Sequence, residues 1–189
     1  MEGYGKREEY AVVLDFLLTG KSSSSRSEPI AQLIGEEMFT LLEAVPKPGV
    51  SLKSGERVYI GRNERDKIAL IKQRISYNEL TQTAKSELLR IVTEIVKNHE
   101  QKYVDIFNTA GPLNIREHSF TLLPGIGRKH LDELLKQRSE KKFESFKDIE
   151  ERVKLTQDPA KIIAERIVQE LQGNERFYLF VKPMFKKEY

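Results

Sequence analysis

The sequence predicts an α+β fold, with a small N-terminal β-barrel over residues 1–80 and a helical domain over residues 81–189. Two patterns predict this division. Short runs rich in Val, Ile, Leu and Tyr, separated by Gly, Pro and Ser, occupy the first 75 residues and are typical of strands. From residue 84 onward, apolar residues recur at three- and four-residue spacing, which is typical of amphipathic helices.

The barrel is expected to contain five short strands. Closing them into a barrel would give each strand a buried face and remove exposed edges. Both an OB-like and an SH3-like topology fit the pattern, and the OB-like one is favoured here. The expected strands are Tyr10–Leu18, Ile30–Ile34, Met38–Val45, Arg57–Ile60 and Lys67–Ile75.

The helical domain is expected to begin with an amphipathic helix at Ala84–His99 whose pattern continues to Ala110 and ends at Gly111-Pro112. A short helix is expected from about Asn114, and a further helix over Arg128–Arg138. Between these two helices lies a turn of unusual composition, Leu123-Pro-Gly-Ile-Gly-Arg-Lys129.

This turn is the most informative segment of the chain, because glycine, an apolar residue and glycine between two helices indicate a helix-hairpin-helix element over residues 115–138. Gly125 and Gly127 permit backbone angles that side chains would block, and Ile126 is expected to pack inward. Arg128 and Lys129 open a helix whose N–H groups and dipole favour a phosphate oxygen. The alternative is a plain tight turn.

A degenerate second copy of the element is expected over residues 146–171. Ser145 and Asp148 have capping-box spacing, and Asp158 followed by Pro159 predicts the start of a helix that ends before Gly173. The second turn lacks Gly-apolar-Gly, so its expected role is structural. The aromatic stretch 176–185 is expected to form a C-terminal strand that packs against the barrel or the helices.

Charge is locally concentrated although the whole chain carries a formal net charge of only +3. Residues 53–74 hold seven basic and three acidic residues, and residues 116–147, which include the hairpin, hold eight basic and five acidic residues. The first of these segments suggests a second binding face on the barrel, where an aromatic ring lies among cations as on surfaces that bind single strands. Its candidate residues are Tyr59, Arg62, Arg65, Lys67, Lys72 and Arg74. The alternative is that Tyr59 packs in the core and the charges are solvated.

Several kinds of site are not expected. The chain has no Cys and three dispersed His residues, so no metal centre or bound cofactor is predicted. His130 is more easily explained by packing than by phosphate binding. No P-loop or nucleophile elbow is present, and no catalytic residues are assigned, so the protein is not expected to be an enzyme. No apolar run suits a membrane span or a signal peptide, which predicts a cytoplasmic protein.

Five segments of the chain together resemble an archaeal family known as domain of unknown function 655. They are EPIAQLIGEEMFTLLEAVPK, SGERVYIG, RISYNEL, LLPGIGRKH and FESFKDIEERV. The resemblance covers nearly the whole chain and implies an OB-like barrel, a helix-hairpin-helix domain and RNA or nucleic-acid binding, with no demonstrated reaction. Gly125, Ile126, Gly127, Arg128 and Lys129 match the Gly-Ile-Gly-basic pattern of the family.

These observations predict a protein that binds nucleic acid through backbone phosphate with little sequence preference. RNA is favoured over DNA only by the family resemblance, because a phosphate-binding hairpin does not recognise the 2′-OH. The competing hypothesis is a protein-interaction or scaffold module without direct nucleic-acid contact, and protein partners are compatible with either hypothesis.

Overall fold

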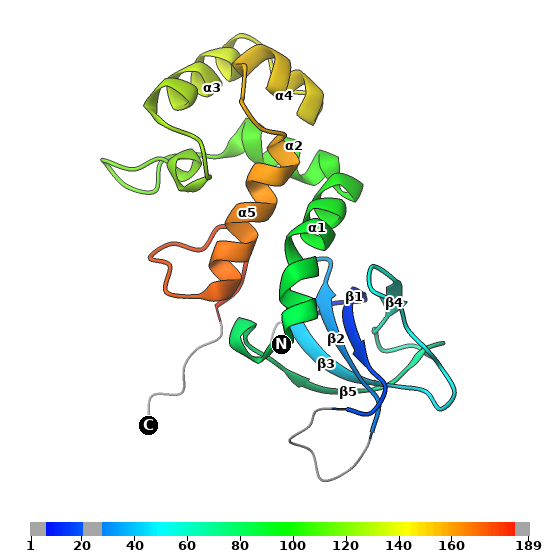
Figure 1. Ribbon diagram of the computed structural model, residues 1–189. Coiled ribbons are helices and arrows are strands. Elements are labelled where there is room, and N and C mark those ends of the chain that lie inside the picture. The colour runs from blue at the N-terminus through cyan, green and yellow to red at the C-terminus, as the bar shows by residue number, and fades with distance from the viewer. Residues whose placement is uncertain (1–6, 21–27, 184–189) are drawn as a thin grey trace, which may run out of the picture. The chain divides into compact units, whose positions relative to one another are not determined.

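The computed structural model describes residues 7–20 and 28–183 and has an α+β architecture (Figure 1). A curled antiparallel sheet is followed by five α-helices and two 3₁₀ turns. The strands are β1 (Tyr10–Leu17), β2 (Ile30–Gly35), β3 (Leu41–Pro46), β4 (Arg57–Tyr59) and β5 (Ile68–Arg74). The helices are α1 (Gln82–Asn98), α2 (Glu100–Thr109), α3 (Arg128–Glu140), α4 (Phe146–Val153) and α5 (Pro159–Gln172), with 3₁₀ turns η1 (Tyr77–Glu79) and η2 (Ser119–Leu122).

The five strands form a half-barrel and not the closed barrel expected from the sequence. Their order is β4-β1-β2-β3-β5, so β4 and β5 are the two edges of the sheet. Register shifts between Val13 and Asp15 in β1, and in the β3–β5 pairing, bend the sheet. β4 has only three residues, which leaves little backbone for a ladder that would close the barrel against β5.

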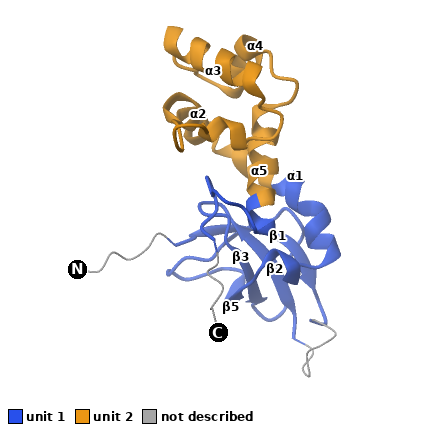
Figure 2. Ribbon diagram, turned by 90° about the vertical axis from the view of Figure 1, so that its left-hand side faces the viewer, with its two compact units in different colours: residues 1–91, 170–189 blue, residues 92–169 orange. Residues whose placement is uncertain are grey.

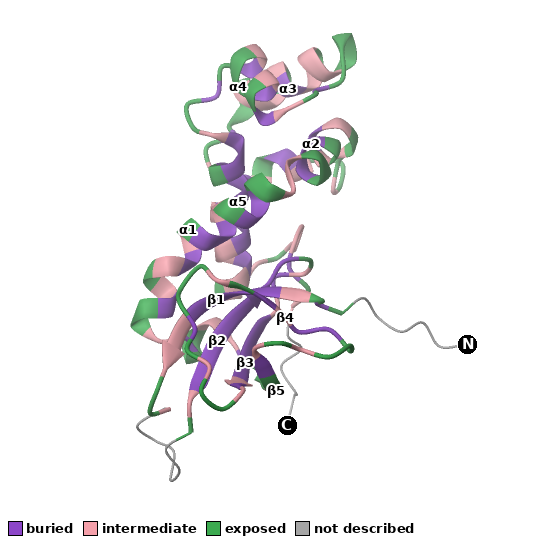
Figure 3. Cartoon of the chain, turned by 90° about the vertical axis from the view of Figure 1, so that its right-hand side faces the viewer, coloured by how far each residue is buried: buried purple, intermediate pink, exposed green. Residues whose placement is uncertain are grey.

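The central strand of the sheet is buried on both faces. All six residues of β2 are buried, and Figure 3 shows β1, β2 and β3 largely in the colour of buried residues. Ala31 and Leu33 lie in the core cluster inside the curl, together with Val58 and Ile68. Continuous apolar runs, in place of strict alternation, are the expected composition for strands covered on both sides.

Gln32 lies within β2 and joins the sheet to the segment that leads into α1. Its side-chain nitrogen donates to Glu79 O at 3.0 Å and to a Glu43 carboxylate oxygen at 3.3 Å, and its side-chain oxygen accepts from Thr81 N at 2.8 Å. The side chain is fully buried, so these bonds satisfy polar groups that would otherwise be costly to bury. They hold the start of α1 against the sheet.

The chain forms two compact units, shown in different colours in Figure 2. Unit 1 contains residues 1–91 and 170–189, and unit 2 contains residues 92–169. The boundary expected near residue 80 differs from this division, because the first half of α1 and the end of α5 group with the sheet. No helix among the described residues is long and apolar enough to cross a membrane.

Two expected elements are absent from the described residues. Residues 114–118 form no helix, because the Asn114 side chain accepts hydrogen bonds from Arg116 N and Glu117 N and so competes with helical bonding. Residues 176–183 form no strand, because Leu179 N, Phe180 N and Val181 N all donate to the Glu170 carboxylate and not to a neighbouring strand. Residues 184 and 185 of the expected strand lie outside the described residues.

The carboxylate of Glu8 fixes the connection between β2 and β3. It accepts hydrogen bonds from Glu37 N at 2.9 Å, Met38 N at 3.0 Å and Thr40 N at 3.0 Å. The side chain also lies against Gly35, where an added Cβ would fall 1.9 Å from its carboxyl carbon. This turn therefore depends on one buried acidic group.

We expect Glu8→Ala to lower the free energy of unfolding by about 2–3 kcal/mol, because three backbone donors lose their acceptor. The neighbouring Glu9, whose side chain is exposed, is the matched control, and Glu9→Ala should change stability by less than about 0.5 kcal/mol. Urea unfolding of both variants measures the difference. Equal effects would show that the hydrogen bonds of Glu8 do not stabilise the turn.

Candidate nucleic-acid interface

The candidate site lies in unit 2, in the turn that joins η2 to α3. Leu123 ends the 3₁₀ turn, and its carbonyl accepts a hydrogen bond from Ile126 N at 3.1 Å. Ile126 is 5% exposed and packs inward, as the sequence predicts. The residues on either side of it, Gly125 and Gly127, are exposed at the apex.

The two glycines have different backbone conformations, contrary to the expectation that both need angles closed to other residues. Gly125 has φ +78°, a left-handed conformation that an L-residue adopts at a cost. Gly127 has φ −85° and ψ −177°, an extended conformation open to any residue, and it forms the N-cap of α3. A Cβ built on either glycine meets nothing within 4 Å. Gly125 is therefore required by the turn, whereas Gly127 contributes open space next to the helix end.

The N-terminus of α3 has unsatisfied hydrogen-bond donors. The first bond of the helix joins Leu131 N to Gly127 O at 2.9 Å, and no side chain caps the helix. The preceding N–H groups, those of Arg128, Lys129 and His130, have no acceptor among the described residues. No acidic residue occupies the first turn of α3. Three donors without an acceptor therefore lie at the positive end of the helix dipole.

Arg128 and Lys129 add two cationic side chains at this helix end. Both residues are exposed, and neither side chain has an ion pair with another described residue. The structure thus brings together all five residues that the sequence assigns to phosphate binding: Gly125, Ile126, Gly127, Arg128 and Lys129. Ile126 is the internal anchor, and the other four form the exposed surface.

The His130 side chain stabilises the turn before α3. Its Nδ1 lies 3.0 Å from Gly125 O, and because a carbonyl only accepts hydrogen bonds, Nδ1 is the protonated nitrogen. The bond joins the first turn of α3 back to the left-handed residue. Packing, and not direct phosphate contact, is the role that this bond supports for Nδ1.

A cavity of about 290 Å³ lies beside this helix end. Its lining includes Lys129, His130 and Glu133 of α3, together with Arg152 and Lys154 at the end of α4. Sequence reasoning did not assign Lys154 to the site. Lys154 has φ +56° and precedes the buried Leu155, just as left-handed Gly125 precedes buried Ile126, so the two turns share a backbone pattern that their sequences conceal.

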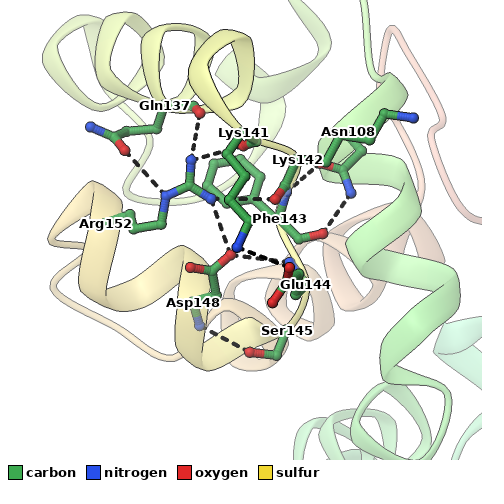
Figure 4. A network of polar contacts seen from close by, with 9 residues as sticks. All are labelled: Asn108, Gln137, Lys141, Lys142, Phe143, Glu144, Ser145, Asp148 and Arg152. Atoms are coloured by element: carbon green, nitrogen blue, oxygen red, sulfur yellow. Dashed lines mark hydrogen bonds and ion pairs between the residues drawn. The ribbon is translucent and has the colours of Figure 1, made fainter.

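Arg152 holds α3 against α4 (Figure 4). Its guanidinium donates to Gln137 O at 2.5 Å and to Lys141 O at 2.8 Å, carbonyls at the C-terminal end of α3, and to the Asp148 carboxylate at 3.1 Å. The guanidinium carbon also lies 4.7 Å from the centre of the Phe143 ring. These contacts satisfy carbonyl groups at the C-terminal end of α3, whereas the N–H groups at its N-terminal end have no acceptor among the described residues.

The segment between α3 and α4 is anchored at two further places. The Asn108 side chain of α2 donates to Phe143 O at 2.9 Å and accepts from Phe143 N at 2.8 Å (Figure 4). Ser145 caps α4 as predicted, accepting from Asp148 N at 3.0 Å. Asp148 in turn accepts from Glu144 N and not from Ser145 N, so the reciprocal half of the capping box is displaced by one residue.

The second candidate face, on the half-barrel, does not form one free basic cluster. The Tyr59 ring packs edge-on against Tyr10 with a centroid distance of 5.2 Å and lies across Gly61, where an added Cβ would fall 2.3 Å from the Tyr59 hydroxyl. Arg65 Nε donates to Gly61 O at 2.9 Å. These contacts favour the packing interpretation for Tyr59.

The remaining basic side chains of that face do not form one group. Those of Lys67, Lys72 and Arg74 contact other residues of the chain, and β5, which carries Lys72 and Arg74, is the edge of the sheet opposite β4. Lys67 pairs with Glu56, an interaction that lowers the pKa of Glu56, and Lys72 lies 3.8 Å from a Glu28 carboxylate oxygen. Arg74, near the end of β5, donates to Lys182 O at 2.8 Å. Arg62, which is exposed, lies in the β4–β5 connection, three residues after Tyr59.

The protein thus has an α+β architecture with a half-barrel, and its helix α3 has no side-chain cap at the N-terminus, where Arg128 and Lys129 are exposed. The chain belongs to the family described as protein of unknown function (DUF655), whose model matches residues 7–182. It is 48% identical over 179 residues to uncharacterized protein MJ0038 of Methanocaldococcus jannaschii, covering 94% of this chain and 81% of that protein. The crystal structure of Af1531 from Archaeoglobus fulgidus, a DUF655 protein, matches with a TM-score of 0.87 at 42% identity, covering 93% of this chain and 100% of that one.

The different backbone angles of the two glycines give a matched pair of substitutions. Gly125→Ala should lower the free energy of unfolding by about 1 kcal/mol, because alanine adopts the left-handed angle only under strain. Gly127→Ala should change it by less than about 0.5 kcal/mol, since the gain from a stiffer unfolded chain offsets the poorer N-cap. Chemical denaturation of both variants measures the pair, and equal losses would contradict the assigned conformations.

The titration of His118 predicts how the stability of the fold depends on pH. Burial, and secondarily the charge of Arg138, lowers the pKa of His118 below 6.5, and its Nδ1 accepts from Phe120 N at 3.2 Å. The unfolded chain then binds the proton more tightly, so stability should fall as the pH drops below about 6.5. His118→Asn keeps an acceptor but does not titrate.

The measurement is the difference in unfolding free energy between wild type and His118→Asn, from urea titrations between about pH 7.5 and about pH 5. We expect wild type to lose stability relative to the variant as the pH falls. A difference that is constant over this range would exclude the His118 contribution.

Proposed function

We propose that this protein binds nucleic acid by gripping backbone phosphate at the N-terminus of α3, with little sequence preference. The observation that supports this most directly is the group of three backbone donors at Arg128, Lys129 and His130 without acceptors among the described residues. Donors of this kind, next to two exposed cations, have the chemistry that a phosphate oxygen requires. Since phosphate contacts position a protein without reading bases, binding should be tolerant of sequence.

The residues around the N-terminus of α3 give further support for phosphate binding at this place. Lys154 lines the same cavity as Lys129 and His130, so a third cationic side chain lies within the region that a bound backbone would occupy. A Cβ on Gly127 would meet no protein atom within 4 Å, which leaves room for a close approach to the backbone. Glu133 is the single acidic residue in the lining of this cavity.

The finer assignments belong to the same proposal. We infer that residues 115–138 act as a helix-hairpin-helix element whose first helix is shortened to the 3₁₀ turn η2, and that the half-barrel of unit 1 is OB-like. RNA is the favoured ligand on the family resemblance alone, because the hairpin chemistry suits either nucleic acid. We also propose that the protein binds nucleic acid without catalysing a reaction, and that it does so in the cytoplasm.

The alternative function is a scaffold that contacts proteins only. Such a surface usually presents a contiguous apolar patch. The large hydrophobic side chains exposed in the described part of the chain are Leu18, Leu70 and Ile115, which lie on three separate segments. This distribution favours the nucleic-acid hypothesis over the scaffold.

We expect the double variant Arg128→Ala, Lys129→Ala to weaken binding to all RNA and DNA sequences alike while leaving the melting temperature nearly unchanged. Its matched control is Lys136→Ala, Lys147→Ala, which removes the same charge from exposed positions of the same unit away from the start of α3. Titration at several salt concentrations measures both. The slope of log affinity against log salt should fall by about 0.9 for each duplex phosphate that the variant no longer neutralises, or by about 0.7 on a single strand.

Gly127→Ala supplies a second readout, because its methyl group would occupy the space that a phosphate approaches while protein stability is preserved. It should weaken binding more than the lysine control does. Equal losses of affinity in the Arg128–Lys129 and control variants would show non-specific charge attraction and overturn the hairpin assignment. Salt-insensitive binding, or no binding at all, would favour the scaffold, and metal-dependent cleavage would refute the non-catalytic assignment.

A further inference from the structure

Unit 1 contains a cavity of about 610 Å³ that shares no residue with the hairpin. Its lining comes from the start of β3, the segment from Arg74 to Asn78, the last turn of α5 and the C-terminal segment up to Pro183. Ligand sites for small molecules typically have volumes of about 300–1,000 Å³. The size is therefore suited to one nucleotide-sized ligand.

The outer wall of this cavity is fixed by two sets of polar contacts. The Glu170 carboxylate, in a residue that is 2% exposed, accepts from Leu179 N at 2.7 Å and from Phe180 N and Val181 N at 2.9 Å each. Arg74 Nη2 binds Lys182 O at 2.8 Å. The wall is thus pre-formed, which reduces the entropy cost of binding a ligand.

The lining combines an apolar floor with polar groups that have unused hydrogen-bonding capacity. Phe39, Leu41, Ile75 and Val181 are buried and line the cavity. At its polar positions, the side chains of Asn78, Asn174 and Tyr178 make no hydrogen bond with any other part of the chain that the structure describes. The two asparagine amides present both donors and acceptors, as the edge of a nucleobase requires.

Two aromatic rings and two cations accompany these amides. The Lys85 ammonium lies 5.3 Å from the centre of the Tyr77 ring, whereas the Tyr178 ring makes no ring or cation contact within the described ranges. Arg74 and Lys182 supply positive charge. The single acidic lining residue, Glu170, already accepts three backbone hydrogen bonds. The charges of the lining therefore favour an anion.

We propose that this cavity binds one nucleotide, with its base stacked on Tyr178, its base edge bound by Asn78 and Asn174, and its phosphate neutralised by Arg74 and Lys182. The nucleotide is either a free mononucleotide or one unpaired nucleotide of a nucleic-acid strand, since both present a base and a phosphate to the cavity. The assignment goes beyond the hairpin function, because it names a separate site in the other compact unit.

The test uses the full chain with isotope-labelled tyrosine rings, whose seven NMR signals are assigned by Tyr→Phe variants. Adenosine and uridine 5′-monophosphates, and a trinucleotide of each base, are titrated separately. The Tyr77 and Tyr178 signals should shift and saturate, while the Tyr59 signal stays unchanged. Saturation by the trinucleotide assigns the site to a strand, and saturation by the monophosphate alone assigns it to a free nucleotide.

Tyr178→Ala should weaken nucleotide binding about tenfold or more through loss of base stacking, and Tyr178→Phe should bind like wild type. Lys182→Gln should lower the affinity for the monophosphate towards that for the unphosphorylated nucleoside. In the Arg128→Ala, Lys129→Ala variant the monophosphate should shift and saturate the Tyr77 and Tyr178 signals as in wild type, which separates this site from the hairpin. The proposal is overturned if no probe shifts Tyr77 or Tyr178 at millimolar concentration, if Tyr178→Ala binds as wild type does, or if the hairpin variant loses the shift.

Discussion

The candidate site depends on the guanidinium of Arg152, which binds the last carbonyls of α3. A helix leaves unsatisfied donors at one end and unsatisfied acceptors at the other. In α3 the acceptors Gln137 O and Lys141 O are taken by Arg152, while no side chain caps the donors at the N-terminus. One arginine thereby anchors the helix within the fold and leaves the opposite end available to a ligand. The Phe143 ring under the guanidinium, held through its backbone by Asn108, keeps this arrangement rigid.

In unit 1, buried carboxylates satisfy backbone N–H groups, just as the Arg152 guanidinium satisfies backbone carbonyls in unit 2. Glu8 and Glu170 each accept three backbone N–H groups from a segment that has no regular secondary structure. Irregular backbone is costly to bury unless its donors find partners. In both cases one side chain supplies those partners, Glu8 from about 30 residues away in the sequence and Glu170 from about 10. The turn after β2 and the outer wall of the 610 Å³ cavity are ordered in this way.

Much of the fold follows from local sequence patterns. The parts that these patterns miss depend on individual side-chain hydrogen bonds, on single backbone angles and on strand pairing. The strands at Tyr10, Ile30 and Arg57, the helix from Arg128 and the Ser145 cap lie where the patterns predict them, because apolar spacing and capping chemistry are local. The missing helix after Asn114 reflects side-chain bonds that compete with the helix. The missing C-terminal strand and the open barrel depend on Glu170 and on strand pairing, which spacing alone does not reveal. At the candidate site, the sequence pointed to the turn at Gly125 but not to the one at Lys154, because the left-handed angle of Lys154 has no glycine to signal it.

Unit 1 is discontinuous in the chain, and this has a consequence for the order in which the protein is assembled. The sheet and the first half of α1 are made before unit 2, whereas Glu170 and the segment to Pro183 are made after it. During synthesis the half-barrel therefore emerges with Phe39, Leu41 and Ile75 lacking the outer wall that later encloses the cavity. A chain cut after the sheet would expose that apolar floor permanently. The segment made after unit 2 is therefore the part of the chain that covers this apolar floor, and unit 1 is complete only after unit 2 has been made.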